Sequence, residues 1–453
     1  MNARRCLGVL RTIWLPLCIA ALCIAHGGPA HALTLRDAVG GALENHPSVA
    51  AAEAERAQAR AAAGIASAAW LPTLSVAGSL TRYEEPMLVF PIHRLDFLHL
   101  PTFDETLIQG GVTASYTLFE GAGRIGRIRQ ACAAERAATF AGEVVEQGVI
   151  AQVTRAYLQA LHQREVLAAH DARLLALQAE KKRVQDLWNV GRAAQIQILQ
   201  TEAAIANAEA DRVAIAGALE LAQRELARLT GLPVDSARAD RLEDFTIVDS
   251  LPASSDELLS QALAASPHLE ESRARVRAAE AGVGVARSER WPELNALGSY
   301  LAYADGSGED TYEWNVGLRL AWPLFTGGAV GKGVERARAA HAGTQAGLAL
   351  AELQVRDELD RAWNAHAEAR ARMASLEAAV AATGEVVRIQ QLLVQTGAGT
   401  ESDYLNAEAD LLESRAALSN ARHGALGAQV ELARVSGRLS REWIDLHIGE
   451  RKR

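Results

Sequence analysis

Two segments of the chain alternate apolar and polar residues in the manner of β-strands with one apolar face. We expect these strands at residues 107–119 and 313–325, with small or polar residues such as Thr113, Ser115 and Asn315 on the opposite face. A tilted strand needs roughly 9–11 residues to cross a bilayer, so both segments are long enough. We therefore expect lipid contact through the apolar face, namely Val112, Ala114, Tyr116, Leu118, Trp314, Leu318, Leu320, Trp322 and Leu324.

Long helical patterns follow each of these strands. We expect helices over 124–188 and 330–395, and return helices over 195–229 and 401–435. At about 1.5 Å per residue, each longer helix would span on the order of 100 Å, more than a single globular core needs. In the first return helix, small and apolar residues recur by steps of three and four, which predicts a coiled-coil seam. Its positions are Ile196, Leu199, Ala203, Ala206, Ala210, Val213 and Gly217.

An internal repeat explains why these elements occur twice. Leu71-Pro72 matches Trp291-Pro292 at a distance of 291 − 71 = 220 residues. Leu118-Phe119-x-Gly121 matches Leu324-Phe325-x-Gly327 at 324 − 118 = 206 residues, so one length difference of 14 lies between the two matches. Each unit begins with a predicted capping box, at Thr34 and Ser254, and its next helix begins at a proline and runs to about 68 or 288.

These patterns divide the chain into five parts. Residues 1–32 have the pattern of a signal peptide. Arg4 and Arg5 precede an apolar stretch that is shorter than a bilayer span requires, and the small residues of Ala30-His31-Ala32 follow it as a cleavage site. The alternative is a membrane anchor. The first repeat is then 33–230, with strands over 72–83 and 107–119, and a linker covers 231–253. The second repeat is 254–437, with strands over 292–303 and 313–325, and the tail 438–453 is expected to fray.

Composition and cysteine usage narrow the functional classes. The 453 residues carry a net charge of −9, so there is no basic footprint for nucleic acid. Of the four cysteines, only Cys132 lies outside the expected leader, which excludes a disulfide within the mature chain. Leu17 and Leu22 precede the leader cysteines where a lipidation site needs a small residue, so we expect no lipid anchor. We find no catalytic motif, cofactor site or metal-ligand spacing, and we expect histidines such as His93, His99, His162 and His170 at the surface.

Four strands per chain predict an oligomer. They cannot close a membrane barrel, and unpaired strand edges are not tolerated in lipid. Copies of the chain must therefore share one barrel, with eight strands in a dimer, twelve in a trimer or sixteen in a tetramer, and twelve or more leave an open lumen. The helices would extend from one end as a coiled-coil cylinder. This arrangement favours a passive conduit over the alternative, a non-conducting periplasmic scaffold.

The duplicated motifs resemble those of the TolC-like outer-membrane efflux protein family. They include LPTLSVAGSL, YTLFEGAGR and VGRAAQIQILQTEA in the first unit, and WPELNALGSY, WPLFTGGAVG and TGAGTESDYLNAEA in the second. The resemblance covers residues 33–437. It implies a mixed α and β outer-membrane protein of a Gram-negative-type envelope. It further implies a homotrimer with a twelve-stranded barrel and a periplasmic helical tunnel, which conducts substrate for an efflux pump or type I secretion system.

The resemblance also implies partners and sites. The partners would be a periplasmic adaptor and, through it, an inner-membrane pump, with outer-membrane lipid around the barrel. The turns between the long and return helices would form the tip that contacts the adaptor, through Val190, Gly191, Arg192, Thr396, Gly397, Ala398 and Gly399. The aperture would be lined by Asp403, Asn406 and Gln197. Asp403 also follows Thr400 by three residues, so a helix-capping role explains it equally well.

Two other features have competing interpretations. Gly121-x-Gly123-x-x-Gly126 matches a dinucleotide-binding fingerprint, but the preceding strand alternates and the following helix is too long for a βαβ unit. We interpret these glycines as easing a tight strand-to-helix corner. The loop expected at 84–106 is unusually apolar. It could cover the barrel mouth as a lid or pack between protomers.

Overall fold

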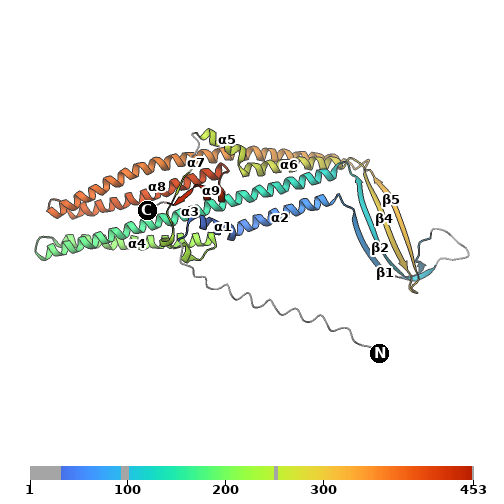
Figure 1. Cartoon of the computed structure of the whole chain (residues 1–453), viewed down its shortest axis with the longest axis horizontal. Helices are drawn as coiled ribbons and strands as arrows, with labels where there is room; N and C mark the ends of the chain where they lie inside the picture. The colour runs from blue at the N-terminus through green and yellow to red at the C-terminus, as the bar shows by residue number, and fades with distance from the viewer. Residues whose placement is uncertain (1–31, 93–101, 249–253, 451–453) are drawn as a thin grey trace, which may run out of the picture.

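The computed structural model describes residues 32–92, 102–248 and 254–450. The expected leader therefore lies outside the described residues, apart from Ala32, as do His93 and His99. The molecule is elongated, with a four-stranded sheet at one end and two helical hairpin tips at the other (Figure 1).

Both repeats fold into the same series of elements. The first contains α1 (Leu35–Asn45), α2 (Pro47–Ala68), β1 (Thr73–Leu88), β2 (Phe103–Phe119), α3 (Gly123–Asn189) and α4 (Gln195–Thr230). The second contains α5 (Ser255–Ala265), α6 (Pro267–Ser288), β4 (Glu293–Ala304), β5 (Asp310–Ala321), α7 (Ala329–Thr396) and α8 (Glu401–Val435). Between them lie η1 (Val234–Ala237), η2 (Ala239–Arg241) and β3 (Phe245–Ile247), and α9 (Arg441–His447) and β6 (Ile448–Glu450) follow.

Local signals set the ends of these helices. Thr34 accepts a hydrogen bond from the Asp37 amide, and the Asp37 carboxylate accepts one from the Thr34 amide, which completes a capping box. Ser254 caps α5 through the Glu257 amide. Pro47 and Pro267 occupy the first turns of α2 and α6, where a missing amide hydrogen costs nothing.

The sheet has the order β1-β2-β4-β5, and all neighbouring strands are antiparallel. Val112 of β2 lies opposite Val76 of β1 and Tyr300 of β4, and Tyr300 lies opposite Trp314 of β5. Because paired residues share a face, this register places the even-numbered residues of the four strands on one side, up to the register shifts between Arg82 and Met87 and between Thr117 and Phe119. β1 and β5 form the two edges of the sheet within the chain.

Two expected boundaries of the sheet region are wrong. Both ends of the loop expected at 84–106 are strand, because β1 continues to Leu88, past an irregularity between Arg82 and Met87, and β2 begins at Phe103. The strand expected at 313–325 ends at Ala321. Pro323 has no amide hydrogen for a strand ladder, so Trp322 and Leu324 lie in the connection to α7.

The main core lies midway along the helices, where the linker and the tail join the two repeats. Tyr157 and Leu161 of α3 pack there with Leu35 of α1 and Leu226 of α4. The tail was expected to fray, but its described residues, 438–450, are folded. Trp443 and Ile444 of α9 are buried in this core, and β6 pairs with β3 of the linker.

The Gly121–Gly126 motif serves the corner where β2 passes into α3. Gly121 adopts a φ of +60°, and a Cβ there would lie 2.5 Å from Cβ of Trp291. At Gly126, a Cβ would lie 2.9 Å from a methyl carbon of Val285, so glycine lets α3 approach α6. Both glycines are thus explained by backbone conformation and close packing.

Candidate functional site

One face of the sheet is apolar across all four strands. Of the residues expected there from the sequence, Val112, Leu118, Trp314, Leu318, Leu320, Trp322 and Leu324 have exposed side chains, while Ala114 and Tyr116 are partly covered. The register adds residues of the first strand of each hairpin, namely Leu74, Val76, Leu80 and Tyr300, all exposed. Sequence analysis missed these four, although Leu74, Val76 and Leu80 alternate with polar residues in the printed sequence.

The opposite face of the sheet is mostly small and polar, with Leu297 and Leu301 of β4 as larger apolar residues. The hydroxyls of Thr73 and Ser115 lie 2.6 Å apart across β1 and β2, as do those of Ser75 and Thr113. Further along the sheet, the Thr117 hydroxyl donates to Asn295 of β4 at 2.7 Å. Rows of hydroxyl and amide groups of this kind suit a surface that faces water.

Both helical tips end in a glycine with left-handed backbone. Gly191 has a φ of +75° and Gly397 a φ of +78°. The amide of Arg192 donates to the Leu187 carbonyl at 2.8 Å, and the amide of Ala398 donates to Leu393 at 2.9 Å, which are Schellman-type closures. The other tip residues named from the sequence, Val190, Thr396 and Gly399, lie in the same two turns, and all except the partly covered Gly399 are exposed.

The three aperture candidates lie on the first two turns of the return helices. The Thr400 hydroxyl donates to Asp403 at 2.7 Å, and the Asp403 amide donates to Thr400 at 3.2 Å, so Thr400 caps α8 and Asp403 supports the cap. Gln197 caps α4 by accepting from the Ala194 amide at 3.1 Å. The side chains of Asp403 and Asn406 are exposed, and that of Gln197 is partly covered.

A buried ionic cluster beside these turns was not found from the sequence. Arg183 of α3 donates to both carboxylate oxygens of Glu180 at 2.8 Å, and its Nη2 lies 3.1 Å from Oε2 of Glu401 on α8. The exposed fraction is 7% for Glu180 and 2% for Glu401. Burial and the neighbouring Glu180 carboxylate raise the pKa of Glu401 to about 8, against its ordinary 4.5. Only a signal linking positions more than 200 residues apart could have revealed this contact.

The seam predicted on α4 does not face α3 within the chain. Residues such as Thr201, Ala208 and Leu226 make that contact and are buried. The predicted stripe of Ile196, Leu199, Ala203, Ala206, Ala210, Val213 and Gly217 is exposed. α7 presents a comparable exposed stripe of Ala374, Ala378, Ala382, Val386 and Ile389. Each chain thus carries two uncovered stripes of small and apolar residues near its tips.

Within the described ranges, no group of His, Cys, Asp and Glu residues could hold a metal ion. The expected surface location of His170 is wrong, since it is buried, and His162 is half-buried with its Nδ1 2.9 Å from the Ser419 hydroxyl. No helix in the same ranges has the length and apolarity to cross a membrane.

The fold matches solved structures of outer-membrane channels. The outer membrane protein VceC of Vibrio cholerae superposes with a TM-score of 0.74 at 22% identity, covering 89% of this chain and 96% of that chain. At this identity the likeness establishes the fold.

Sequence comparison establishes the family. The outer membrane efflux protein BepC of Brucella suis is 24% identical over 316 residues, which are 68% of this chain and 67% of that protein. The outer membrane protein TolC of Vibrio cholerae is 23% identical over 445 residues, which are 96% of this chain and 98% of that protein. The family model "Outer membrane efflux protein" matches residues 38–232 and 258–438, one range in each repeat. The TolC-like family, the outer-membrane location and the channel function expected from the sequence are thereby confirmed, and the chain belongs to the outer membrane efflux protein family.

Proposed function

We propose that three copies of this chain form one outer-membrane duct, with a twelve-stranded barrel continued by a periplasmic helical tunnel. The observation that carries the proposal is the four-stranded sheet with apolar residues on one face, polar residues on the other and two open edges. Lipid cannot satisfy the open edges of β1 and β5, so strands of neighbouring copies pair with them. Three copies supply twelve strands, enough for a water-filled interior, whereas eight would be filled by side chains.

The exposed stripes near the tips support the same assembly. Neighbouring copies bury them when the α4 stripe, which includes Ala206 and Val213, packs against the α7 stripe, which includes Ala378 and Val386. Small residues at steps of three and four let two helices approach closely. The same contact would close the helical part into a cylinder around the extended lumen.

In this assembly the apolar face contacts outer-membrane lipid and the tips face the cell interior. The turns at Gly191 and Gly397 dock onto a periplasmic adaptor, which connects the duct to an inner-membrane pump. Their exposure and their place at the far end of long helices support this role. Asp403, Asn406 and Gln197 line the aperture, and transport through the duct is passive.

Mass and conductance measurements test the duct. Protein extracted from outer membranes with detergent is expected to have three times the mass of the mature chain by light scattering. It is also expected to give stepwise single-channel currents in planar bilayers. A non-conducting scaffold, the alternative function, would be released from the membrane fraction without detergent. It would give no channel currents in planar bilayers.

Photo-crosslinking tests the docking role separately. A photoreactive amino acid at Val190 or Thr396 is expected to capture an adaptor protein in cells. The same amino acid at Leu446, whose side chain is 79% exposed but lies far from the tips, serves as the control. Equal capture from all three positions would refute docking at the tips.

A further inference from the structure

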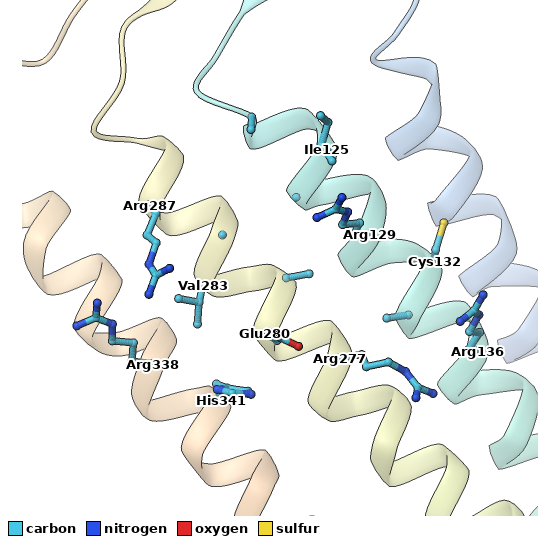
Figure 2. A pocket seen from close by; sticks show the side chains of 15 residues that line it. Ile125, Arg129, Cys132, Arg136, Arg277, Glu280, Val283, Arg287, Arg338 and His341 are labelled. Atoms are coloured by element: carbon cyan, nitrogen blue, oxygen red, sulfur yellow. The ribbon is translucent and has the colours of Figure 1, made fainter.

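A cavity of about 800 Å³ lies between α3, α6 and α7, next to the corners that lead into the sheet. Its lining carries the arginines Arg129, Arg136, Arg277, Arg287 and Arg338. Glu280 is the one acidic residue of the lining, so with His341 neutral the local charge is 5 − 1 = +4. Figure 2 shows these side chains spread over several turns of the three helices, with Arg277 and Arg287 of α6 between Arg129 of α3 and Arg338 of α7. The positive charge contrasts with the net charge of −9 for the whole chain.

Most of these arginines lack an internal partner. Within the described part of the chain, Arg277 reaches only Glu270, at 3.8 Å. The other four, Arg129, Arg136, Arg287 and Arg338, form no ion pair in the same part of the chain. Arginines elsewhere on these helices commonly pair with an acid one turn away, as Arg361 of α7 does with Asp357 at 2.7 Å. Several guanidinium groups without counter-charges repel one another. Binding of an anion in the cavity reduces this repulsion and is therefore favourable.

The cavity lies close to the expected membrane boundary. Trp70, Trp291 and Trp322 occupy the junctions between helices and strands, and all three are more than half exposed. Tryptophans of this kind mark the membrane–water interface of barrel proteins. Along α3 the cavity extends from Ala122 to Arg136, which is within roughly 20 Å of the sheet. The end of the cavity nearest the sheet, where Ala122 and Arg287 lie, is therefore within reach of lipid head groups.

We propose that this arginine cavity binds phosphate groups, supplied by a lipid head group or by a soluble polyphosphate. Guanidinium groups recognise phosphate through paired N–H donors, and several arginines around one cavity hold several phosphate oxygens at once. The volume accommodates a glycerophosphate head group.

Removing two of the arginines tests the proposal. The variant R129Q/R338Q takes one guanidinium from α3 and one from α7 while keeping a polar side chain at both positions. The matched control R336Q/R372Q removes two charges from exposed positions of α7 that do not line the cavity. Circular dichroism on all three proteins verifies that the helices are retained.

Two binding arms distinguish the sources of phosphate. The first titrates inorganic pyrophosphate into the detergent-purified protein by calorimetry at constant ionic strength. The second counts phosphatidylglycerol molecules, against phosphatidylcholine, that remain bound in native mass spectra. We expect binding in at least one arm, weakened on the order of tenfold or more in R129Q/R338Q and unchanged in the control. Absence of binding in both arms, or equal binding by R129Q/R338Q and wild type, would overturn the proposal.

Discussion

Nη2 of Arg183 lies 3.1 Å from Oε2 of Glu401, and this contact joins α3 of the first repeat to the first turn of α8 in the second. The two residues are 401 − 183 = 218 positions apart in the chain. Glu180 holds the same guanidinium from the α3 side. Two buried acidic side chains thus meet one guanidinium group between the two tip hairpins. We expect this contact to hold the two hairpins together.

The raised pKa of Glu401 makes this contact sensitive to pH. The pKa of Glu401 is higher in the folded structure than its ordinary value, so Glu401 binds its proton more tightly there. Protonated Glu401 therefore stabilises the contact between α3 and α8, and this stabilisation is greatest at low pH. This stabilisation is lost as pH rises from the ordinary 4.5 through about 8, where Glu401 ionises beside Glu180. We expect single-channel conductance to increase between about pH 6 and pH 9 as the hairpins separate.

The variant Glu401→Gln keeps the size of the side chain and removes the ionisation. Its conductance is expected to stay constant over the same pH range. Glu413→Gln, at an exposed position of α8, is the control and should respond like wild type. If Glu401→Gln retained the full pH response, the cluster would not control the contact.

The aperture role of Asp403 can be separated from its capping role. Asn can still accept the hydrogen bond from Thr400, so Asp403→Asn preserves the start of α8 and removes one negative charge per chain. We expect block of the channel by divalent cations to weaken on the order of fivefold, because a unit charge a few ångströms away contributes about 1 kcal/mol even in water. Currents recorded with added Mg²⁺ measure this block. Asp410→Asn, at an exposed position of the same helix, should leave it unaltered.

The α4 stripe predicts where a charge should disrupt assembly. Ala206 lies on the stripe and Asn207 beside it, and both are exposed in the single chain. Ala206→Glu would bury an unpaired carboxylate between copies, at a cost of several kcal/mol, whereas Asn207→Glu would leave its carboxylate in water. We expect the first variant to lose the trimer and the second to keep it, as judged by light scattering in detergent. Identical masses for the two variants would exclude the stripe from the interface.

Local sequence patterns such as helix caps predicted much of the fold. The features that sequence analysis did not predict depend on contacts between residues far apart in the chain. Thr34, Ser254 and Thr400 each precede an acid by three residues and cap a helix in the structure. Sequence analysis did not predict that the tail packs into the core, because the residues that bury Trp443 belong to other elements and share no local pattern with it. For the same reason, sequence analysis did not reveal the contact between Arg183 and Glu401.

The α4 stripe shows a different limit of sequence reasoning. Its spacing indicated a packing surface, but spacing does not specify the partner helix. Within the chain, Thr201 and Ala208 on the other side of α4 meet α3 instead. The candidate sites at the tips came from the resemblance to the family, and their exposure followed only from the structure.

Tyr157 ties the first residues of the first repeat to the linker. Its hydroxyl lies 2.7 Å from the carbonyl oxygen of Leu33 and 2.8 Å from that of Glu243, and it accepts from the Glu243 amide at 2.9 Å. Burial raises the pKa of the Tyr157 phenol well above its ordinary 10.0, so the hydroxyl remains a donor throughout the neutral range. Its ring also packs edge-on against Phe245, with centroids 5.9 Å apart.

Tyr157→Phe keeps the ring and removes the hydroxyl, which leaves buried backbone groups without their partner. We expect the free energy of unfolding to fall by about 1–3 kcal/mol, with no dependence on pH between about 6 and 8. Denaturant titration of the detergent-solubilised protein, followed by circular dichroism, measures the loss. Tyr300→Phe removes a hydroxyl from an exposed strand residue and should change stability little. A stability loss confined to Tyr157→Phe would show that the central core depends on this hydroxyl, and equal losses would refute that dependence.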